Sequence, residues 1–258
     1  MPLNLVFAFL LSTAIGLSLG LLGGGGSILA VPVLVYVAGV APHQAVPMSL
    51  AIVGTTSLLA GGLHHRSGRV SLRAALIFGA AGMLGAYFGA KGTHLVEGHV
   101  LLLLFALLML VVGGWMLAPF AQRLVASHHD TQSHRPHLVL TLLAGLGVGA
   151  LTGFLGVGGG FLAVPALVLF SRLPISHAVG TSLYVIALNS LAGFIGHLGG
   201  TQLALGQTVA FTAAALLGTV VGHRIATRTH PQRLRRAFAV FVLCVGAAIA
   251  AQALLSRG

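Results

Sequence analysis

Long apolar segments dominate this sequence and leave it too few charged residues to cover a water-soluble surface. Of its 258 residues, 57% are hydrophobic and only 6% are charged, whereas soluble domains carry about 25% charged residues. Five apolar segments precede a polar stretch at 119–137 and five follow it. Most have 18 to 22 residues, enough for a helix to cross the ~30 Å hydrocarbon core of a bilayer. The sequence therefore predicts an all-α polytopic membrane protein.

The two sets of five segments are copies of one unit. The phrase GLLGGGGSILAVP at 20–32 returns as GFLGVGGGFLAVP at 153–165, a shift of 133 residues. The same shift places Ser57 on Ser190 and keeps glycines, prolines, serines and a histidine in register over about 45 residues. Hydrophobic low complexity does not produce such a match, so we take the repeat as real. The predicted units are an N-terminal transmembrane repeat (1–118), a His-rich linker (119–137) and a C-terminal transmembrane repeat (138–258).

The charges of the loops predict that the second repeat is inverted, as an odd number of segments per repeat requires. The loop at 64–73 has three arginines, whereas its counterpart at 199–206 has no charge. Conversely, the loop at 91–99 has no net charge, whereas its counterpart at 223–236 has five arginines. By the positive-inside rule, the Arg-rich loops and the linker face the cytoplasm and both termini face the other side.

The second segment of each repeat is short and broken. It has about 13 residues, contains Pro32 or Pro165, and follows a glycine cluster. Short, broken segments at equivalent places in two inverted halves are typical of a transporter's binding site. The alternative is that they are re-entrant hairpins, which leaves fewer full crossings but the same charge pattern.

The glycine clusters themselves predict an anion site near the bilayer midplane. Glycine lets backbone N–H groups approach a ligand, and a helix N-terminus carries partial positive charge. We expect new helices to begin at Ile28 and Phe161, directly after the clusters. The alternative is that the glycines only allow tight crossings or turns. The residues predicted to bind substrate here are Gly23, Gly24, Gly25, Gly26, Ser27, Gly156, Gly158, Gly159 and Gly160.

Polar side chains on the third and eighth segments are predicted to add hydrogen-bond donors. Ser49 and Ser57 correspond to Ser182 and Ser190, and Asn189 lies beside the last of these. Residues eight positions apart lie about 80° apart around a helix, so one broad face carries both serines of a segment. The alternative role is hydrogen bonding between helices.

Histidines are the titratable residues with a candidate functional role. His64 and His197 end their segments at equivalent positions. They are either interfacial residues or residues with a gating or coupling role, which the charge change of imidazole near neutral pH would provide. Four further histidines and Asp130 lie in the linker. They define an alternative function, a metal-ion permease. We favour a polar loop without a metal site, because no helical i, i+4 pair of histidines fixes a ligand geometry.

Several functional classes are excluded by what the sequence lacks. Both acidic residues, Glu97 and Asp130, lie outside the apolar segments, which argues against an intramembrane carboxylate that binds protons or sodium. An intramembrane enzyme would need a nucleophile with a placed base, or paired carboxylates, and no Gly-x-Ser-x-Gly elbow is present. We therefore expect no enzymatic activity and no cofactor. The basic residues serve as topology signals, so no nucleic-acid partner is expected.

Small residues recur on two further segments. Glycines at 79, 82, 85 and 89, and at 218 and 222, form faces suited to close helix packing. These faces predict seams within the subunit or a homodimer between subunits.

The duplicated phrases, each followed by a helix with Ala-Val-x-x-Ser-Leu, resemble the sulfite exporter TauE/SafE family of membrane transporters. The resemblance covers nearly the whole chain. It implies a permease, an exporter or facilitator, for small sulfur-containing anions such as sulfite or organosulfonates, placed in a bacterial inner membrane among lipids, with periplasmic termini. One departure from the doubled pattern is Pro47, whose counterpart is Gly180, so the two halves of the site are not equivalent.

Overall fold

Helices are the regular elements throughout the described part of the chain, which in this computed structural model comprises residues 3–117, 138–156, 160–171, 173–197, 204–226, 240 and 243–251. The first half contains α1 (Leu3–Leu22), the 3-10 helix η1 (Gly23–Leu29), α2 (Ala30–Pro32), the π-helical turn η2 (Val33–Val37), α3 (Pro42–Arg66), α4 (Leu72–Gly92), the 3-10 turn η3 (Thr93–Leu95) and α5 (Gly98–Leu117). The second half contains α7 (Leu138–Leu155), α8 (Gly160–Phe170), α9 (Ile175–His197), α10 (Leu205–Ala226) and a helical segment at 243–251. Within the described residues, five helices are long and apolar enough to cross a membrane, namely α3, α4, α7, α9 and α10. The prediction of an all-α polytopic membrane protein is confirmed.

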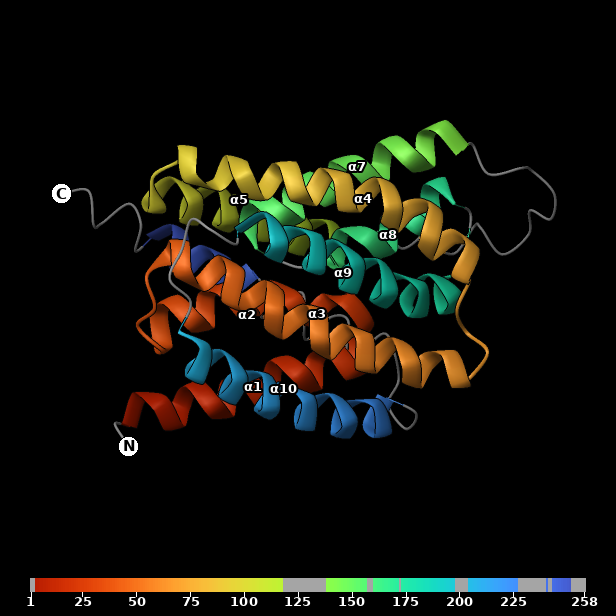
Figure 1. Cartoon of the computed structure of the whole chain (residues 1–258). Helices are drawn as coiled ribbons and strands as arrows, with labels where there is room; N and C mark the ends of the chain where they lie inside the picture. The colour runs from red at the N-terminus through yellow and green to blue at the C-terminus, as the bar shows by residue number, and fades with distance from the viewer. Residues whose placement is uncertain are drawn as a thin grey trace.

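Local sequence explains where α3 and α4 begin and end. Pro42 occupies the start of α3, where a missing N–H costs no helical hydrogen bond. After Arg66 the chain turns through Gly68, whose φ of +69° favours glycine. The side chain of Ser71 then caps α4 by accepting a hydrogen bond from the backbone N–H of Ala74 at 3.4 Å. The two helices consequently run in opposite directions, and α9 packs against both of them (Figure 1).

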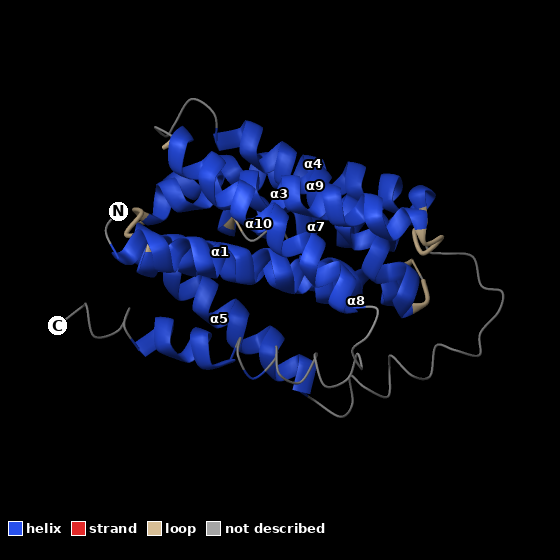
Figure 2. Cartoon of the chain, turned by 90° about the horizontal axis from the view of Figure 1, so that it is seen from below, coloured by secondary structure: helices blue, strands red, loops and turns tan. Residues whose placement is uncertain are grey.

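The long helices pack in three layers. In Figure 1, α4 lies beside α7 at the top, α3 and α9 lie in the middle, and α1 lies beside α10 at the bottom. Figure 2 shows α5 to one side of this bundle. There, the backbone at Gly246 of the segment 243–251 lies against Met109 of α5.

The glycine faces form seams between helices of the two halves. On α1, a Cβ at Gly16 would collide with the backbone carbonyl of Ala215 on α10. On α7, a Cβ at Gly149 would collide in the same way with Gly82 on α4. Both contacts are related by the 133-residue shift, so the packing repeats as the sequence does. The predicted seams within the subunit are thus observed, and the homodimer stays a prediction.

The directions of the helices differ between the halves. In Figure 1, α1 begins at the end of the bundle marked N, whereas α7 begins at the opposite end. Helices α3 and α10, which lead into the two Arg-rich loops, finish at the same end of the bundle as each other. The arrangement therefore has the opposed directions that an inverted repeat needs.

Candidate functional site

The two broken segments meet inside the bundle. Helix η1 packs against α1, α8 and α9, and Ser27 and Ile28 within it are completely buried. The first segment is irregular as predicted, passing from a 3-10 helix through one α-helical turn at Pro32 to a π-helical turn. The second, α8, has only 11 residues. The predicted positions Gly158 and Gly159 lie outside the described residues.

The predicted helix start at Ile28 is wrong, whereas the start predicted at Phe161 lies one residue from the observed start of α8. Helix η1 already begins at Gly23, so the first glycine cluster is itself helical, and α8 begins at Gly160. The cause is the close return of the chain onto α1. A Cβ at Gly26 would collide with the side chain of Ser18, and glycines allow the tight 3-10 coil to lie there. The cluster therefore packs as a helical segment against α1.

Ser49 connects the first repeat to the second glycine cluster. Its hydroxyl, on α3, lies within hydrogen-bond distance of the carbonyl oxygens of Val46 and Gly156. Gly156 ends α7 with a φ of +71°, and a Cβ there would stand 2.8 Å from the side chain of Val46. The equivalent Ser182 is also buried and donates to the carbonyl of Val179 at 2.8 Å. Both serine hydroxyls thus have partners within the protein.

Three other predicted residues lie near the crossing of α3 and α9, two of them between these helices and the third on the opposite side of α9. A Cβ at Gly54 would stand 3.0 Å from Cβ of Ser190, and Gly61 likewise faces α9. Ser57 lies between these two glycines on the same face of α3. On the far side of α9, a Cβ at Gly82 of α4 would collide with the amide of Asn189. We call Ser57, Asn189 and Ser190 the crossing cluster.

The crossing cluster is buried yet lacks internal hydrogen bonds. The hydroxyl oxygens of Ser57 and Ser190 and both polar atoms of the Asn189 amide have no hydrogen-bond partner among the described residues. An unsatisfied buried polar group costs about 1–3 kcal/mol. The polar atoms of Ser57 and Ser190 on the α3 side of α9, and of Asn189 on its α4 side, are therefore unused within the described residues.

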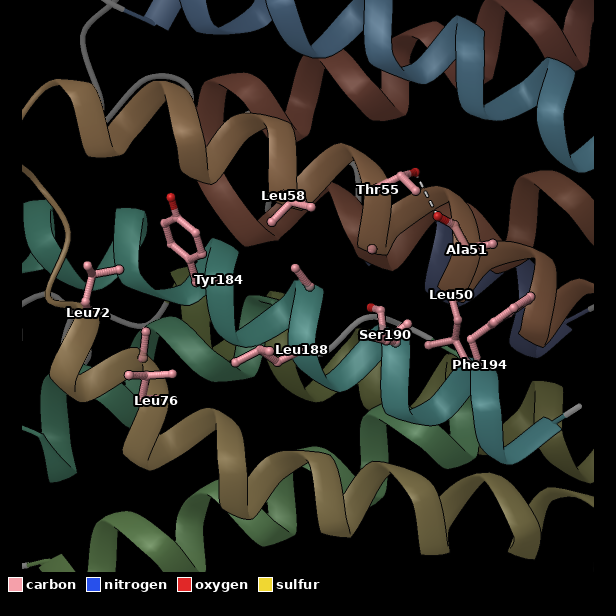
Figure 3. A pocket seen from close by; sticks show the side chains of 14 residues that line it. Leu50, Ala51, Thr55, Leu58, Leu72, Leu76, Tyr184, Leu188, Ser190 and Phe194 are labelled. Atoms are coloured by element: carbon pink, nitrogen blue, oxygen red, sulfur yellow. Dashed lines mark hydrogen bonds between the residues drawn. The ribbon is translucent and has the colours of Figure 1, made fainter.

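A cavity of about 430 Å³ adjoins the crossing cluster between α3, α4 and α9. Figure 3 shows Ser190 in its wall, among mostly apolar side chains. The wall also contains Leu58, Leu76 and Leu191, each more than half exposed. The cavity thus faces the bilayer side of the helices. It is too apolar to be a site for a small anion by itself.

The predicted gating histidines lie at different ends of the bundle, because α3 and α9 run antiparallel. His197 is buried, and its Nδ1 lies 2.8 Å from the carbonyl oxygen of Gly193. His64 packs edge-on against the ring of His223 on α10, with ring centroids 5.0 Å apart. The sequence reasoning missed His223, and its counterpart in the repeat, Ala90, gave no signal for it.

The His-rich linker at 119–137 lies outside the described residues. Within the residues that the structure does describe, no group of three or more His, Cys, Asp or Glu side chains is placed to hold a metal ion.

Comparison with known proteins agrees with this architecture. The family model for the sulfite exporter TauE/SafE matches residues 8–249. A probable membrane transporter protein of Xylella fastidiosa (strain Temecula1) is 38% identical over 234 residues, which cover 90% of this chain and 89% of the relative. The probable membrane transporter proteins YdhB of Bacillus subtilis and MJ0441 of Methanocaldococcus jannaschii are 27% and 28% identical, over 71% and 77% of this chain and 75% and 72% of their own lengths. No solved structure matches the chain.

Fold and comparisons together define a multi-pass membrane transporter made of helices. Within that class, the chain belongs to the sulfite exporter TauE/SafE family.

Proposed function

We propose that this transporter moves small sulfur-containing anions, such as sulfite or organosulfonates, by alternating access around the crossing cluster and the adjoining glycine segments. The crossing cluster carries the proposal, because it presents three buried side chains whose polar atoms lack partners among the described residues. Hydroxyl and amide groups donate hydrogen bonds to the oxygens of a sulfite or sulfonate group without introducing a countercharge.

The electrostatics of the bundle favour an anion. The described helices from α3 to α10 contain no acidic side chain, since Glu97 lies in the turn before α5 and is 3.0 Å from His99. The chain as a whole carries thirteen Lys and Arg residues against two acids. A negative solute therefore meets no fixed negative charge between α3 and α9.

The proposed location of the transporter is the bacterial inner membrane. The Arg-rich ends of α3 and α10 face the cytoplasm and the start of α1 faces the periplasm, as the positive-inside rule favours. The transporter is an exporter or facilitator in which an intramembrane carboxylate is not the coupling group, because both acids, Glu97 and Asp130, lie outside the apolar segments.

Flux of labelled anions into proteoliposomes tests this function. The panel contains sulfite, sulfate, thiosulfate and two organosulfonates, with chloride and a divalent metal ion as comparison solutes. We expect sulfur anions to be transported, and expect Asn189→Leu and the double variant Ser57→Ala/Ser190→Ala to lower their flux at least about tenfold. A lost donor to a charged group accounts for about 1.5–3 kcal/mol, which corresponds to this range.

A neighbouring hydroxyl provides the matched control. Thr56 is equally buried on α3, but its hydroxyl already donates to the carbonyl of Ile52 at 2.7 Å. Thr56→Val should therefore leave the flux unchanged. Normal sulfur-anion flux in the well-folded crossing-cluster variants would show that the anion passes elsewhere.

A further inference from the structure

His64 and His223 form a histidine pair in which two ring nitrogens have no partner. The rings meet edge to face, 77° between planes and 5.0 Å between centroids. Nε2 of His64 and Nδ1 of His223 are buried, and neither has a hydrogen-bond partner within the described chain. A buried imidazole nitrogen without a partner is costly, so the pair has unused capacity to bind a ligand.

The pair lies at the end of α1 where the first glycine segment begins. A Cβ at Gly20 would stand 2.7 Å from the backbone nitrogen of His223, and Gly23 starts η1 three residues later. His64 is the last-turn residue of α3, the helix that carries Ser57. His64 thus lies on the same helix as Ser57, and His223 packs on the end of α1 that leads into η1.

The surroundings of the pair are cationic. Arg66 ends α3, Arg69 lies in the turn that follows and interacts electrostatically with His64, and Arg224 follows His223 on α10. His65 points to α9, where its ring meets Tyr184. Helix α1 contributes no titratable side chain, and the first glycine segment through η2 contributes only Tyr36. Such a setting attracts an anion and disfavours a metal cation.

The pair has no equivalent at the other end of the bundle. The 133-residue shift relates His64 to His197, but it relates His223 to Ala90. At that end, Gly196, next to His197, packs on Ala90 and the backbone of Tyr87. The two mouths of an inverted-repeat transporter therefore differ here in their chemistry.

We propose that His64 and His223 form a proton-linked binding station for the oxyanion at the Arg-rich mouth of the pathway. This inference rests on the proposed anion transport. The two ring N–H groups donate to the sulfite or sulfonate oxygens, and one proton taken up by the pair neutralises the charge of the bound anion. Because the repeat equivalent of His223 at the other mouth is Ala90, anion and proton are loaded together at the Arg-rich mouth.

The test uses the full chain in proteoliposomes and a simple alkylsulfonate, whose own charge is constant between about pH 5 and pH 8. Sulfonate Kd and flux are measured across this range. If one proton accompanies the anion, the affinity rises by up to about tenfold for each pH unit by which the pH falls. His223→Ala, which copies the Ala90 end, should abolish this rise and weaken binding at low pH.

Two conservative variants separate hydrogen bonding from protonation. The amide nitrogen of Gln in His64→Gln replaces Nε2, and that of Asn in His223→Asn replaces Nδ1, but neither amide takes up a proton. Both variants should keep the flux seen at about pH 8 and lose the increase at lower pH. They also keep the test decisive if the alanine variant does not fold.

His65→Gln is the matched control, because His65 is an exposed neighbour whose ring faces α9, and it should keep the wild-type pH profile. If the wild type transports sulfonate and His64→Gln and His223→Asn retain its pH profile, the binding station is refuted while the proposed function stands. If the wild type transports no sulfur anion at any pH, both are refuted.

Discussion

The hydroxyl of Ser49 on α3 lies within hydrogen-bond distance of the carbonyl oxygen of Gly156, 107 residues later in the chain. This contact fastens the first repeat to the point where α7 ends and the second glycine cluster begins. Ser49→Ala removes the donor and leaves a buried carbonyl unsatisfied, which should cost about 1–2 kcal/mol of stability. The measurement is the thermal unfolding midpoint of the purified protein in detergent.

Thr55→Val supplies the comparison for this variant, because the exposed Thr55 hydroxyl bonds only within its own helix, to the carbonyl of Ala51 at 2.8 Å. An equal midpoint for Ser49→Ala and Thr55→Val would mean that the contact with Gly156 does not stabilise the fold.

Gly156 should tolerate no side chain. Its φ of +71° disfavours L-residues, and a Cβ would be pressed against Val46 and Ser49. We expect Gly156→Ala to lower stability by about 2 kcal/mol or more, since backbone strain and overpacking act together. Gly62 on α3 has open space around its Cβ position, so Gly62→Ala should be neutral or stabilising by up to about 1 kcal/mol. Similar unfolding midpoints for the two alanine variants would contradict this prediction.

Two glycines of α7 test the packing between α4 and α7 within a single helix. A Cβ at Gly149 would collide with the backbone of Gly82, whereas nothing lies within 4 Å of a Cβ at Gly147. Gly149→Ala should therefore separate the helices and reduce stability by about 1–3 kcal/mol, while Gly147→Ala should not. Unfolding in detergent and the yield of monodisperse protein measure the difference. If Gly149→Ala were as stable as Gly147→Ala, α4 and α7 would not pack through this face.

The sequence was sufficient to predict the helices and much of the cluster in their middle. Hydropathy alone indicates where α1, α7 and α10 begin and end, because a bilayer requires uninterrupted apolar runs. The repeat adds the equivalence of Ser57 with Ser190, and both are indeed buried where α3 and α9 cross. Polar residues within an apolar segment thus indicate which polar side chains are buried between helices.

Contacts between distant helices were beyond the reach of the sequence. Hydropathy does not say which face of a helix meets which neighbour, so nothing indicated that Ser49 is joined to Gly156. A repeat predicts only what its halves share, and His223 is aligned with Ala90. The start of η1 was also misplaced, because the return of Gly26 onto α1 is a tertiary contact that overrides local helix signals.

The His-rich linker discriminates between anion transport and metal transport. Its four histidines and Asp130 offer metal ligands, whereas the proposed anion site lies among α3, α9 and the glycine segments. Deletion of residues 127–136 should therefore leave sulfur-anion flux within about twofold of wild type, since a polar linker outside the apolar segments contributes little to binding inside the bilayer. Parallel measurements with zinc or nickel ions should show no linker-dependent uptake. Metal uptake by the intact chain that disappears on deletion, with sulfur anions not transported by either form, would establish the metal permease instead.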